Sequence, residues 1–252
     1  YGPVMDLGLS DKRVLVTGGS RGIGKAIVAS FLDEGAQVAM CARNVSGLES
    51  TANEFAHRGD VHHRATDLGD VDSVNEYVEW AGETLGGIDV VISNVSAMSS
   101  RDLNVGYEVD IRGSQTLIHG ALHLMGDHVG ANVVCIGSRA GSVGIRWMPA
   151  YAAYKAATVS LVKSTALQVA RRGIRVNCVS PGDILFDGGT WADARDNNEK
   201  LYNAILRENP FRRLGTPEEI ADVVTFVASE RASFMTGSNV LVDGGATPSL
   251  QL

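Results

Sequence analysis

Three side chains in the middle of the chain have the types and spacing needed for acid–base chemistry. Tyr151 and Lys155 stand four residues apart at the start of a long helical pattern, so they share one helix face. A phenol is a poor base at neutral pH, but a nearby ammonium favours its phenolate form. Ser138 closely follows a predicted buried strand, where its hydroxyl could bind a carbonyl oxygen. Tyr154 falls on another face and is the weaker candidate. Together with the turn described next, the three residues predict proton transfer at a carbonyl or alcohol.

A glycine-rich turn follows the first apolar run of the chain. Residues 17–24 read Thr-Gly-Gly-Ser-Arg-Gly-Ile-Gly and lead into an amphipathic helical pattern. Gly18 permits a tight turn, Gly22 lets the backbone approach a pyrophosphate, and Gly24 allows close packing of helix and strand. The free N–H groups at the helix start favour phosphate. The turn predicts a dinucleotide site, with a turn that serves packing alone as the alternative. The predicted cofactor contacts here are Gly18, Ser20, Arg21, Gly22, Ile23 and Gly24.

The end of the second predicted strand indicates which dinucleotide is expected. NAD sites usually carry an acid there for the ribose hydroxyls, whereas this chain has Ala42 followed by Arg43. Arg43 and Arg21 could bind a 2′-phosphate through charge-assisted hydrogen bonds. The sequence therefore favours NADP(H) over the alternative of two ordinary surface arginines.

Short β-rich runs alternate with helical patterns along the whole chain. Most runs are continuously apolar, as expected for parallel strands covered on both faces. The pattern predicts an α/β fold with a doubly wound, seven-stranded parallel sheet, Rossmann-like, as a single domain over residues 4–252. The predicted strands are Arg13–Thr17, Gln37–Cys41, Val61–Ala65, Asp89–Ile92, Asn132–Ile136, Arg175–Val179 and Asn239–Val242.

The composition excludes several classes of protein. Among 252 residues there are 22 Lys and Arg against 29 Asp and Glu, and this net charge of −7 argues against general affinity for nucleic acid. No apolar stretch has transmembrane length, so we expect no membrane partner. Cys41, Cys135 and Cys178 lie in apolar runs without metal-ligand spacing, which predicts buried, reduced thiols in a cytoplasmic protein. The histidines also lack such spacing, and no metal site is predicted.

These motifs resemble the short-chain dehydrogenase/reductase family from Thr17 to about Gly245. Further matches are Asp67 with Leu68, Pro181 with Gly182, Arg213–Ile220 and Val242–Gly245. The resemblance implies that Tyr151 is the general acid/base, that Ser138 polarises the carbonyl, and that Lys155 holds the nicotinamide ribose and activates Tyr151. It also implies a homo-oligomer, most often a tetramer, built partly through helices near residues 104–126 and 150–171. The further cofactor contacts that it implies are Asp67, Leu68, Asn94, Tyr151, Lys155, Pro181, Gly182 and Ile184.

The chain departs from the family pattern at three places. The family's Asn-Asn-Ala-Gly appears as Ser93–Ser96, which keeps only Asn94. Asp110 replaces an Asn that usually completes a proton relay to the lysine. A carboxylate there could pair with Lys155 and weaken its effect on Tyr151, which predicts altered catalysis; a surface acid is the equally weighted alternative. Phe186 stands where a Thr that contacts the nicotinamide amide is common.

The segment from Gly182 to Asn209 interrupts the alternation of strands and helices. It is rich in acidic and aromatic residues and follows a strand end, where open sheets place ligands, so we expect a substrate lid; an ordinary solvated helix is the alternative. Arg139 and Arg146, with Trp147 beside them, could line an entrance for an anionic or amphipathic carbonyl compound. Surface cations and core packing explain these residues equally well.

The sequence favours an NADP(H)-dependent oxidoreductase that transfers a hydride between nicotinamide and a small carbonyl or secondary alcohol. Reduction is the expected direction, because NADPH usually serves reductions. A 3-oxoacyl-carrier-protein reductase is one alternative, suggested by Arg213–Ile220. A dinucleotide-sensing or scaffold protein with a decayed active site is an alternative of another class.

Overall fold

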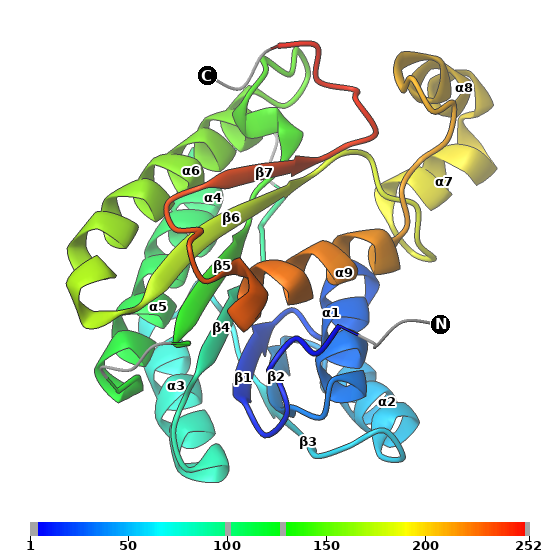
Figure 1. The fold of residues 1–252 in the computed structure, drawn as a ribbon. Helices are drawn as coiled ribbons and strands as arrows, with labels where there is room; N and C mark the ends of the chain where they lie inside the picture. The colour runs from blue at the N-terminus through cyan, green and yellow to red at the C-terminus, as the bar shows by residue number, and fades with distance from the viewer. Residues whose placement is uncertain (1–4, 99–101, 127–129, 250–252) are drawn as a thin grey trace.

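A computed structural model describes residues 5–98, 102–126 and 130–249. Within these ranges a seven-stranded sheet forms the centre of the molecule (Figure 1). The strands lie in the order β3-β2-β1-β4-β5-β6-β7, and all neighbours are parallel. The order reverses between β1 and β4, so the predicted doubly wound, Rossmann-like fold is confirmed. The predicted domain ends, at residues 4 and 252, lie outside the described residues. The strands are β1 (Arg13–Thr17), β2 (Gln37–Ala42), β3 (Val61–Ala65), β4 (Val90–Ser93), β5 (Asn132–Ile136), β6 (Arg175–Pro181) and β7 (Asn239–Val242).

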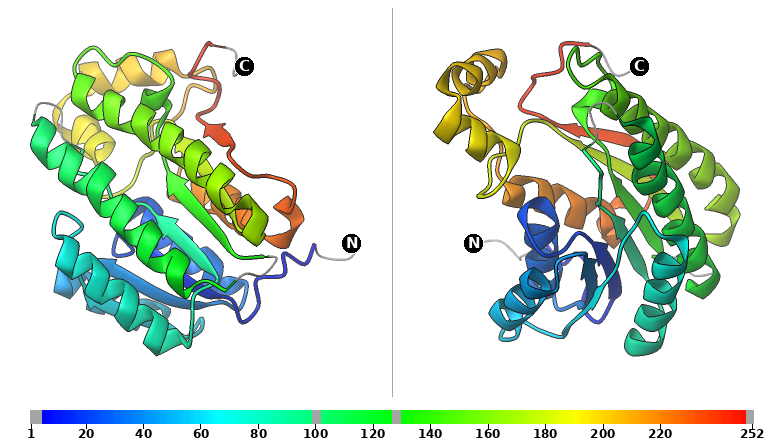
Figure 2. Two further views of the ribbon diagram at one scale, coloured as in Figure 1. Left: turned by 90° about the vertical axis from the view of Figure 1, so that its left-hand side faces the viewer. Right: turned by 180° about the vertical axis from the view of Figure 1, so that it is seen from behind.

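Helices cover both faces of this sheet (Figures 1 and 2). One face carries α1 (Gly22–Asp33), α2 (Val45–Phe55) and α9 (Pro217–Ala228), and the other carries α3 (Val71–Leu85), α5 (Ser114–Leu124) and α6 (Pro149–Val169). The shorter elements are α4 (Leu103–Gly106), the π-helix η1 (Tyr107–Gly113), and the 3-10 turns η2 (Arg139–Gly141), η3 (Ala170–Arg172) and η4 (Glu230–Ala232). Because all strands run in one direction, their carboxyl ends meet at one edge, where such folds bind ligands.

Three of the described strands differ from the prediction. β2 continues to Ala42 instead of Cys41, and β4 continues to Ser93 instead of Ile92. β4 begins at Val90 instead of Asp89, and the Asp89 carboxylate accepts hydrogen bonds from the backbone N–H of Arg13 at 2.9 Å and from its guanidinium at 2.8 and 2.7 Å. β6 continues to Pro181, because that residue still pairs with Val242 of β7. The extension carries β6 to the edge where the site lies.

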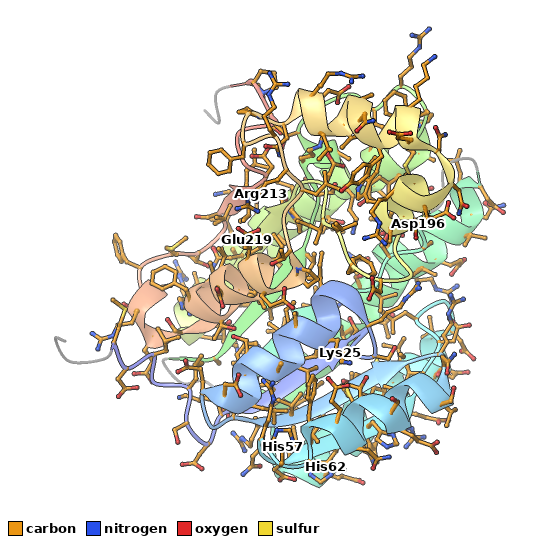
Figure 3. All side chains as sticks on the ribbon, turned by 90° about the vertical axis from the view of Figure 1, so that its right-hand side faces the viewer. Lys25, His57, His62, Asp196, Arg213 and Glu219 are labelled. Carbon is orange, nitrogen blue, oxygen red and sulfur yellow. The ribbon has the colours of Figure 1, made fainter. Side chains whose placement is uncertain are left out.

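The segment after β6 forms two helices, α7 (Thr190–Asn197) and α8 (Glu199–Glu208). They stand apart from the sheet, beyond the strand ends (Figure 1 and the right view of Figure 2). Asp196 marks α7 in Figure 3, far from Lys25 on α1. The segment is helical, as the alternative of an ordinary solvated helix expects. It also lies beyond the strand ends, where a lid over the site would have to lie. Its function as a lid stays a prediction.

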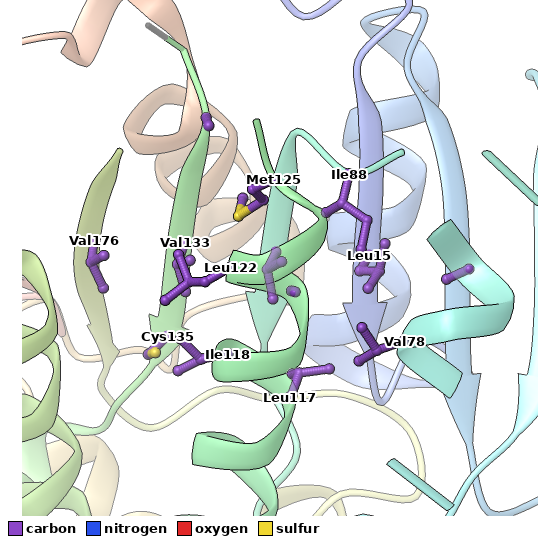
Figure 4. Close-up of a cluster of buried hydrophobic side chains, with 14 of the residues drawn as sticks. Leu15, Val78, Ile88, Leu117, Ile118, Leu122, Met125, Val133, Cys135 and Val176 are labelled. Atoms are coloured by element: carbon purple, nitrogen blue, oxygen red, sulfur yellow. The ribbon is translucent and has the colours of Figure 1, made fainter. Parts of the chain in front are cut away.

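Alternate residues of each strand enter two separate cores. Leu15 of β1 packs under α3 and α5, whereas its neighbours Val14 and Val16 pack under α1 and α9. Figure 4 shows the first core, with Leu117 and Ile118 of α5 over the sheet. Burial on both faces explains why the strands read as continuous apolar runs. Over the described ranges, no helix is both long enough and apolar enough to cross a membrane.

Candidate active site

The glycine turn between β1 and α1 is held by backbone contacts. The N–H groups of Gly18 and Gly19 donate to the carbonyl of Cys41 at 2.7 and 3.1 Å, which ties the turn to β2. Gly18 and Gly22 have φ values of 71° and 53°, which favour glycine. A Cβ atom on Gly24 would collide with the carbonyl oxygen of Gly18. The shape of the turn therefore requires residues without a Cβ atom at these positions, as the spacing of the glycines predicts.

Asn94 and Thr17 fasten the end of β4 to this turn. The Asn94 amide donates to the carbonyl oxygen of Thr17 at 2.9 Å, and the Asn94 backbone N–H donates to the Thr17 hydroxyl at 2.9 Å. The side chain of Asn94 thus stabilises the turn through its bond to Thr17. Its contact with a cofactor stays a prediction. Sequence reasoning missed the role of Thr17, although Thr17 opens the motif.

The two predicted phosphate-binding arginines are exposed and lie at the same edge of the sheet. Arg21 is the extended residue before α1, and its guanidinium donates to the carbonyl of Gly188 at 3.4 Å. Arg43 follows β2, and the next residue, Asn44, caps α2 by accepting from Gly47 at 2.9 Å. Both side chains are therefore accessible to solvent beside the glycine turn, and their contact with a phosphate stays a prediction. The carbonyl of Ser20 accepts from the Thr51 hydroxyl at 3.3 Å, which anchors the tip of the turn.

Tyr151 and Lys155 share one face of α6, as predicted. The ammonium of Lys155 lies 5.7 Å from the centre of the Tyr151 ring and donates to the carbonyl of Ile136 at 3.1 Å. Lys155 is buried, whereas Tyr151 is half-buried. The Tyr154 hydroxyl turns away and donates to the carbonyl of Leu103 at 2.5 Å. Tyr154 therefore braces α4, and Tyr151 is the tyrosine that lies beside the ammonium.

The turn that carries Ser138 packs directly against this helix. The Ser138 hydroxyl accepts from the N–H of Ala140 at 3.1 Å and caps η2. A Cβ atom on Gly141 would lie 2.8 Å from the backbone carbonyl group of Lys155, so only glycine allows this approach. Ser138, Tyr151 and Lys155 are thus brought to one end of α6 by β5, η2 and a close backbone contact.

Asp110 is buried and faces Lys155. Its Oδ1 atom lies 3.5 Å from the Lys155 ammonium, and its Oδ2 atom accepts from the N–H of Ala97 at 2.9 Å. Among the described residues Oδ1 has no hydrogen-bond partner, so the ammonium is its counter-charge. Asp110 belongs to the π-helix η1, a rare form that often occurs at functional sites. The surface-acid alternative is wrong: the carboxylate is part of the lysine's surroundings.

Two thiols lie on the strands beneath Lys155. Cys135 of β5 and Cys178 of β6 are paired in register, and burial raises the pKa of both thiols. Burial also raises the pKa of Cys41 to about 12. All three cysteines are free and buried, as predicted. The thiols stay neutral, and in the part of the chain that the structure describes the ion-pair partner of Lys155 is the carboxylate of Asp110.

The loop after β6 closes the other side of the glycine turn. The N–H of Gly182 donates to the carbonyl of Val242 at 2.9 Å, and Ile184 is buried in a bridge with Gly215. The Phe186 ring lies between Gly22 and Gly189, at which Cβ atoms would come within 2.8 and 2.9 Å of it. An aromatic ring therefore touches the glycine turn where the resemblance places a threonine.

The remaining predicted cofactor residues lie after β3. Asp67 is exposed, and its carboxylate accepts from the N–H of Gly69 at 3.0 Å. Leu68 is buried, and its carbonyl approaches Gly113 so closely that a Cβ atom there would collide with it. This contact holds the π-helix against the strand ends, a role for Leu68 that its position in the motif does not reveal.

Arg139 does not stand free at an entrance, contrary to one expectation from the sequence. Its guanidinium pairs with Asp183 at 3.1 Å, and both side chains are largely buried. Arg146 and Trp147 are exposed beside the start of α6. Sequence reasoning missed Asp183 as the partner; its place directly after the Pro-Gly pair was the available signal.

The Arg213–Ile220 segment builds the start of α9. Thr216 and Glu219 form a reciprocal capping box, with bonds of 3.4 and 2.9 Å between side chains and backbone N–H groups. Arg213 and Glu219 lie side by side in Figure 3 and form a bidentate ion pair, which lowers the pKa of Glu219 to about 2. This motif stabilises a helix, so by itself it does not indicate an acyl-carrier substrate.

Comparison with known proteins identifies the family. A family model described as "Enoyl-(Acyl carrier protein) reductase" matches residues 18–247. The chain belongs to the short-chain dehydrogenase/reductase family. Isoepoxydon dehydrogenase patN of Penicillium expansum is 36% identical over 252 residues, covering 96% of this chain and 97% of the relative. L-fucose dehydrogenase of Mus musculus is 37% identical over 257 residues, covering 94% and 89%.

Solved structures of the family share the whole fold. L-sorbose reductase from Gluconobacter frateurii, complexed with NADPH and L-sorbose, superposes with a TM-score of 0.91 at 29% identity, covering 98% of this chain and 100% of that chain. The RhlG/NADP complex of Pseudomonas aeruginosa has a TM-score of 0.89 at 26% identity, covering 97% and 100%. The chain is therefore similar to short-chain oxidoreductases over nearly its full length.

Proposed function

We propose that this short-chain dehydrogenase/reductase transfers a hydride between NADP(H) and a carbonyl or secondary alcohol. One observation carries the proposal: the buried Lys155 ammonium lies 5.7 Å from the Tyr151 ring, and the Ser138 turn packs on the backbone of Lys155. A phenol, an ammonium and a hydroxyl are thereby grouped near the carboxyl ends of the strands. This is the set that proton transfer to a carbonyl oxygen requires.

The cofactor residues fit an NADP(H) molecule. Gly18, Gly22 and Gly24 allow the tight, closely packed turn that precedes α1, and the free N–H groups at the start of this helix favour a pyrophosphate. Arg21 and Arg43 are exposed at the same edge and suit a 2′-phosphate. NADPH and NADP in the related complexes support this choice. The other proposed contacts are Ser20, Ile23, Asp67, Leu68, Asn94, Tyr151, Lys155, Pro181, Gly182 and Ile184.

In the direction of reduction, Tyr151 donates its phenolic proton to the carbonyl oxygen, and the Ser138 hydroxyl donates a hydrogen bond to the same oxygen. Lys155 favours the phenolate that remains, because its ammonium lies beside the ring. Asp110 and the carbonyl of Ile136 hold that ammonium in place. NADPH, when bound, supplies the hydride.

The proposed substrate is a small hydroxylated carbonyl compound. Two of the relatives are named for sugars, L-fucose and L-sorbose. Arg139 is paired with Asp183 and is not free to bind an anionic substrate. This contact removes one of the two arginines that had favoured anionic compounds, and the names of the two relatives place neutral polyhydroxylated ketones and alcohols first in a substrate screen.

We also propose a homo-oligomer, as the family resemblance implies, in the cytoplasm, as the free thiols favour. Leu124 on α5 and Leu167 on α6 are 43% and 75% exposed. Apolar side chains on these two helices are the surface that another copy would cover. Light scattering after gel filtration measures the oligomeric state. A monomer at micromolar concentration would overturn this part of the proposal.

A combined binding and turnover screen tests the proposed function. NADPH and NADH are compared by thermal shift, and then by oxidation of each cofactor with ketoses, other ketones, diketones and 3-oxoacyl thioesters. We expect the larger shift with NADPH and turnover of a hydroxylated ketone. Turnover of the thioesters alone would support the acyl-carrier alternative. A thermal shift without any turnover would support a sensing or scaffold role, and a larger shift with NADH would overturn the roles of Arg21 and Arg43.

A further inference from the structure

Arg139 lies where three separate segments meet. It belongs to η2, directly after Ser138, and its Nη2 atom is 3.1 Å from Asp183 and 4.0 Å from Glu208. Asp183 follows β6 at the start of the predicted lid, and Glu208 is the last residue of α8. One guanidinium therefore contacts both ends of the segment of residues 182–209, which we call the lid segment.

The contact with Asp183 is largely shielded from water. Both side chains are 14% exposed, whereas the Glu208 side chain is 57% exposed. Burial raises the pKa of Asp183, and the positive charge of Arg139 opposes that rise, while Glu208 and Asp243 add negative charge nearby. Without Arg139, a buried carboxylate would lose its counter-charge and the carboxylates would repel one another.

The lid segment has contacts with the rest of the protein near its start, which include the bridge between Ile184 and Gly215, and in a second place at its end. Near its start, the Phe186 ring and the carbonyl of Gly188 touch the glycine turn. At its end, Asn209 is buried and donates to the carbonyl of Asp243 at 3.0 Å, next to Glu208. Arg139 is the side chain that joins this second place to the turn carrying Ser138.

We propose that Arg139 is a positioning residue that fixes the lid segment to the catalytic-serine turn. Through Asp183 and Glu208 it holds the lid segment in the arrangement in which a substrate carbonyl meets Ser138. The inference rests on the proposed function, since it assigns the lid segment to substrate binding. A pair that only stabilises the fold would change the melting temperature and leave substrate binding as it is.

Glu208→Gln tests the bridge with little risk to folding, because this carboxylate is exposed. Glu199→Gln, at the other end of α8, is the matched control; Glu199 is exposed, and among the described residues its carboxylate accepts a hydrogen bond from Asn203 in the same helix. We expect Glu208→Gln to raise the KM for the carbonyl substrate about two- to fivefold, the range of an exposed ion pair. The Kd for NADPH should not change in either variant, and the Glu199→Gln control should keep the KM of the wild type. Equal KM values for the two variants would contradict the bridge.

Substitution of Arg139 gives the larger effect. Arg139→Met should raise KM at least about tenfold, since it leaves a buried carboxylate without its partner. The KM of Arg139→Lys should lie between those of the wild type and Arg139→Met. The lysine ammonium can pair with Asp183 but lacks the forked guanidinium that also approaches Glu208. If Arg139→Met folds poorly, the Arg139→Met/Asp183→Leu variant removes the unpaired charge. We expect this double variant to regain stability and keep a raised KM; recovery of both would overturn the proposal.

Limited digestion with trypsin separates this inference from the proposed function, because it needs no turnover. Arg195, Lys200 and Arg207 supply cleavage sites within the lid segment. We expect Arg139→Met and Glu208→Gln to be cut there faster than the wild type and the Glu199→Gln control. Cleavage at the wild-type rate would overturn the inference even if the protein proves to be an active reductase.

Discussion

The two halves of the site are built from different materials. The glycine turn is shaped by backbone hydrogen bonds to Cys41 and by glycines, at which there is no room for a Cβ atom. The proposed catalytic cluster is instead held by buried or largely buried charges, with Lys155 facing Asp110 at 3.5 Å and Arg139 facing Asp183 at 3.1 Å. The turn should therefore be sensitive to added atoms, and the cluster to changes of charge.

Gly24→Ala is the sharpest way to break the first half. The new methyl group would collide with the carbonyl oxygen of Gly18, so the turn must shift. Overpacking of this kind costs about 1–3 kcal/mol, and we expect NADPH binding to weaken by up to about a hundredfold. Titration calorimetry gives the Kd. Gly144→Ala is the control, because no atom lies within 4 Å of a Cβ at that position; similar affinities for both variants would contradict this description of the turn.

Asp110→Asn tests the second half by removing a charge at nearly constant size. Among the described residues, the titratable groups near Lys155 are Asp110, Tyr151 and the neutral thiols of Cys135 and Cys178. Loss of the carboxylate leaves the ammonium uncompensated, which favours the phenolate. We expect the pH at half-maximal alcohol oxidation to fall by about one unit.

The control for Asp110→Asn is Glu108→Gln on the same π-helix, where the carboxylate pairs with Arg112 at 2.6 Å on the surface. Its pH profile should match that of the wild type. An Asp110→Asn profile that stays in place or moves to higher pH would show that the charge of Asp110 does not act on Tyr151.

Glu219→Gln gives the smallest expected effect, because it lies outside both halves. The variant loses part of a capping box and an exposed ion pair, which together contribute about 1 kcal/mol at neutral pH. The folded-state pKa of Glu219 is lowered from 4.5 to about 2, so its contribution is present above pH 4.5 and is lost as the pH falls towards 2. Urea unfolding at several pH values measures the difference.

The control for Glu219→Gln is Glu218→Gln, the exposed neighbour in the same helical turn. That variant should lose less stability at neutral pH. A Glu219→Gln difference that persists unchanged at low pH would contradict the ion-pair explanation.

The two halves also differ in how far the sequence predicts them. The glycine turn is local: Gly18, Gly22 and Gly24 lie within one short motif, so their spacing predicts the geometry. Tyr151 and Lys155 are likewise placed by helical periodicity. The orientation of Asp110 depends on the π-helix, whose extra residue per turn leaves no clear mark in the sequence.

Most contacts between distant segments could not be predicted; the pairing of Asp110 with Lys155 was one of two alternatives that the family resemblance raised. Arg139 and Asp183 meet because β5 and β6 are neighbours in the sheet, and Glu208 joins them only after α7 and α8 fold back. The Phe186 ring reaches Gly22 because the loop after β6 packs against the turn between β1 and α1. Such pairs are set by the packing of whole elements, which a linear pattern of residue types does not specify.

Comparison of Tyr151→Phe with the wild type tests the central claim most directly. The substitution removes one hydroxyl from a half-buried ring and leaves Lys155 and Asp110 in place. We expect NADPH-dependent reduction to fall by about a hundredfold to ten-thousandfold, the usual contribution of a general acid, while the Kd for NADPH stays within a factor of about three. Undiminished turnover in the Tyr151→Phe variant would contradict the proposed mechanism.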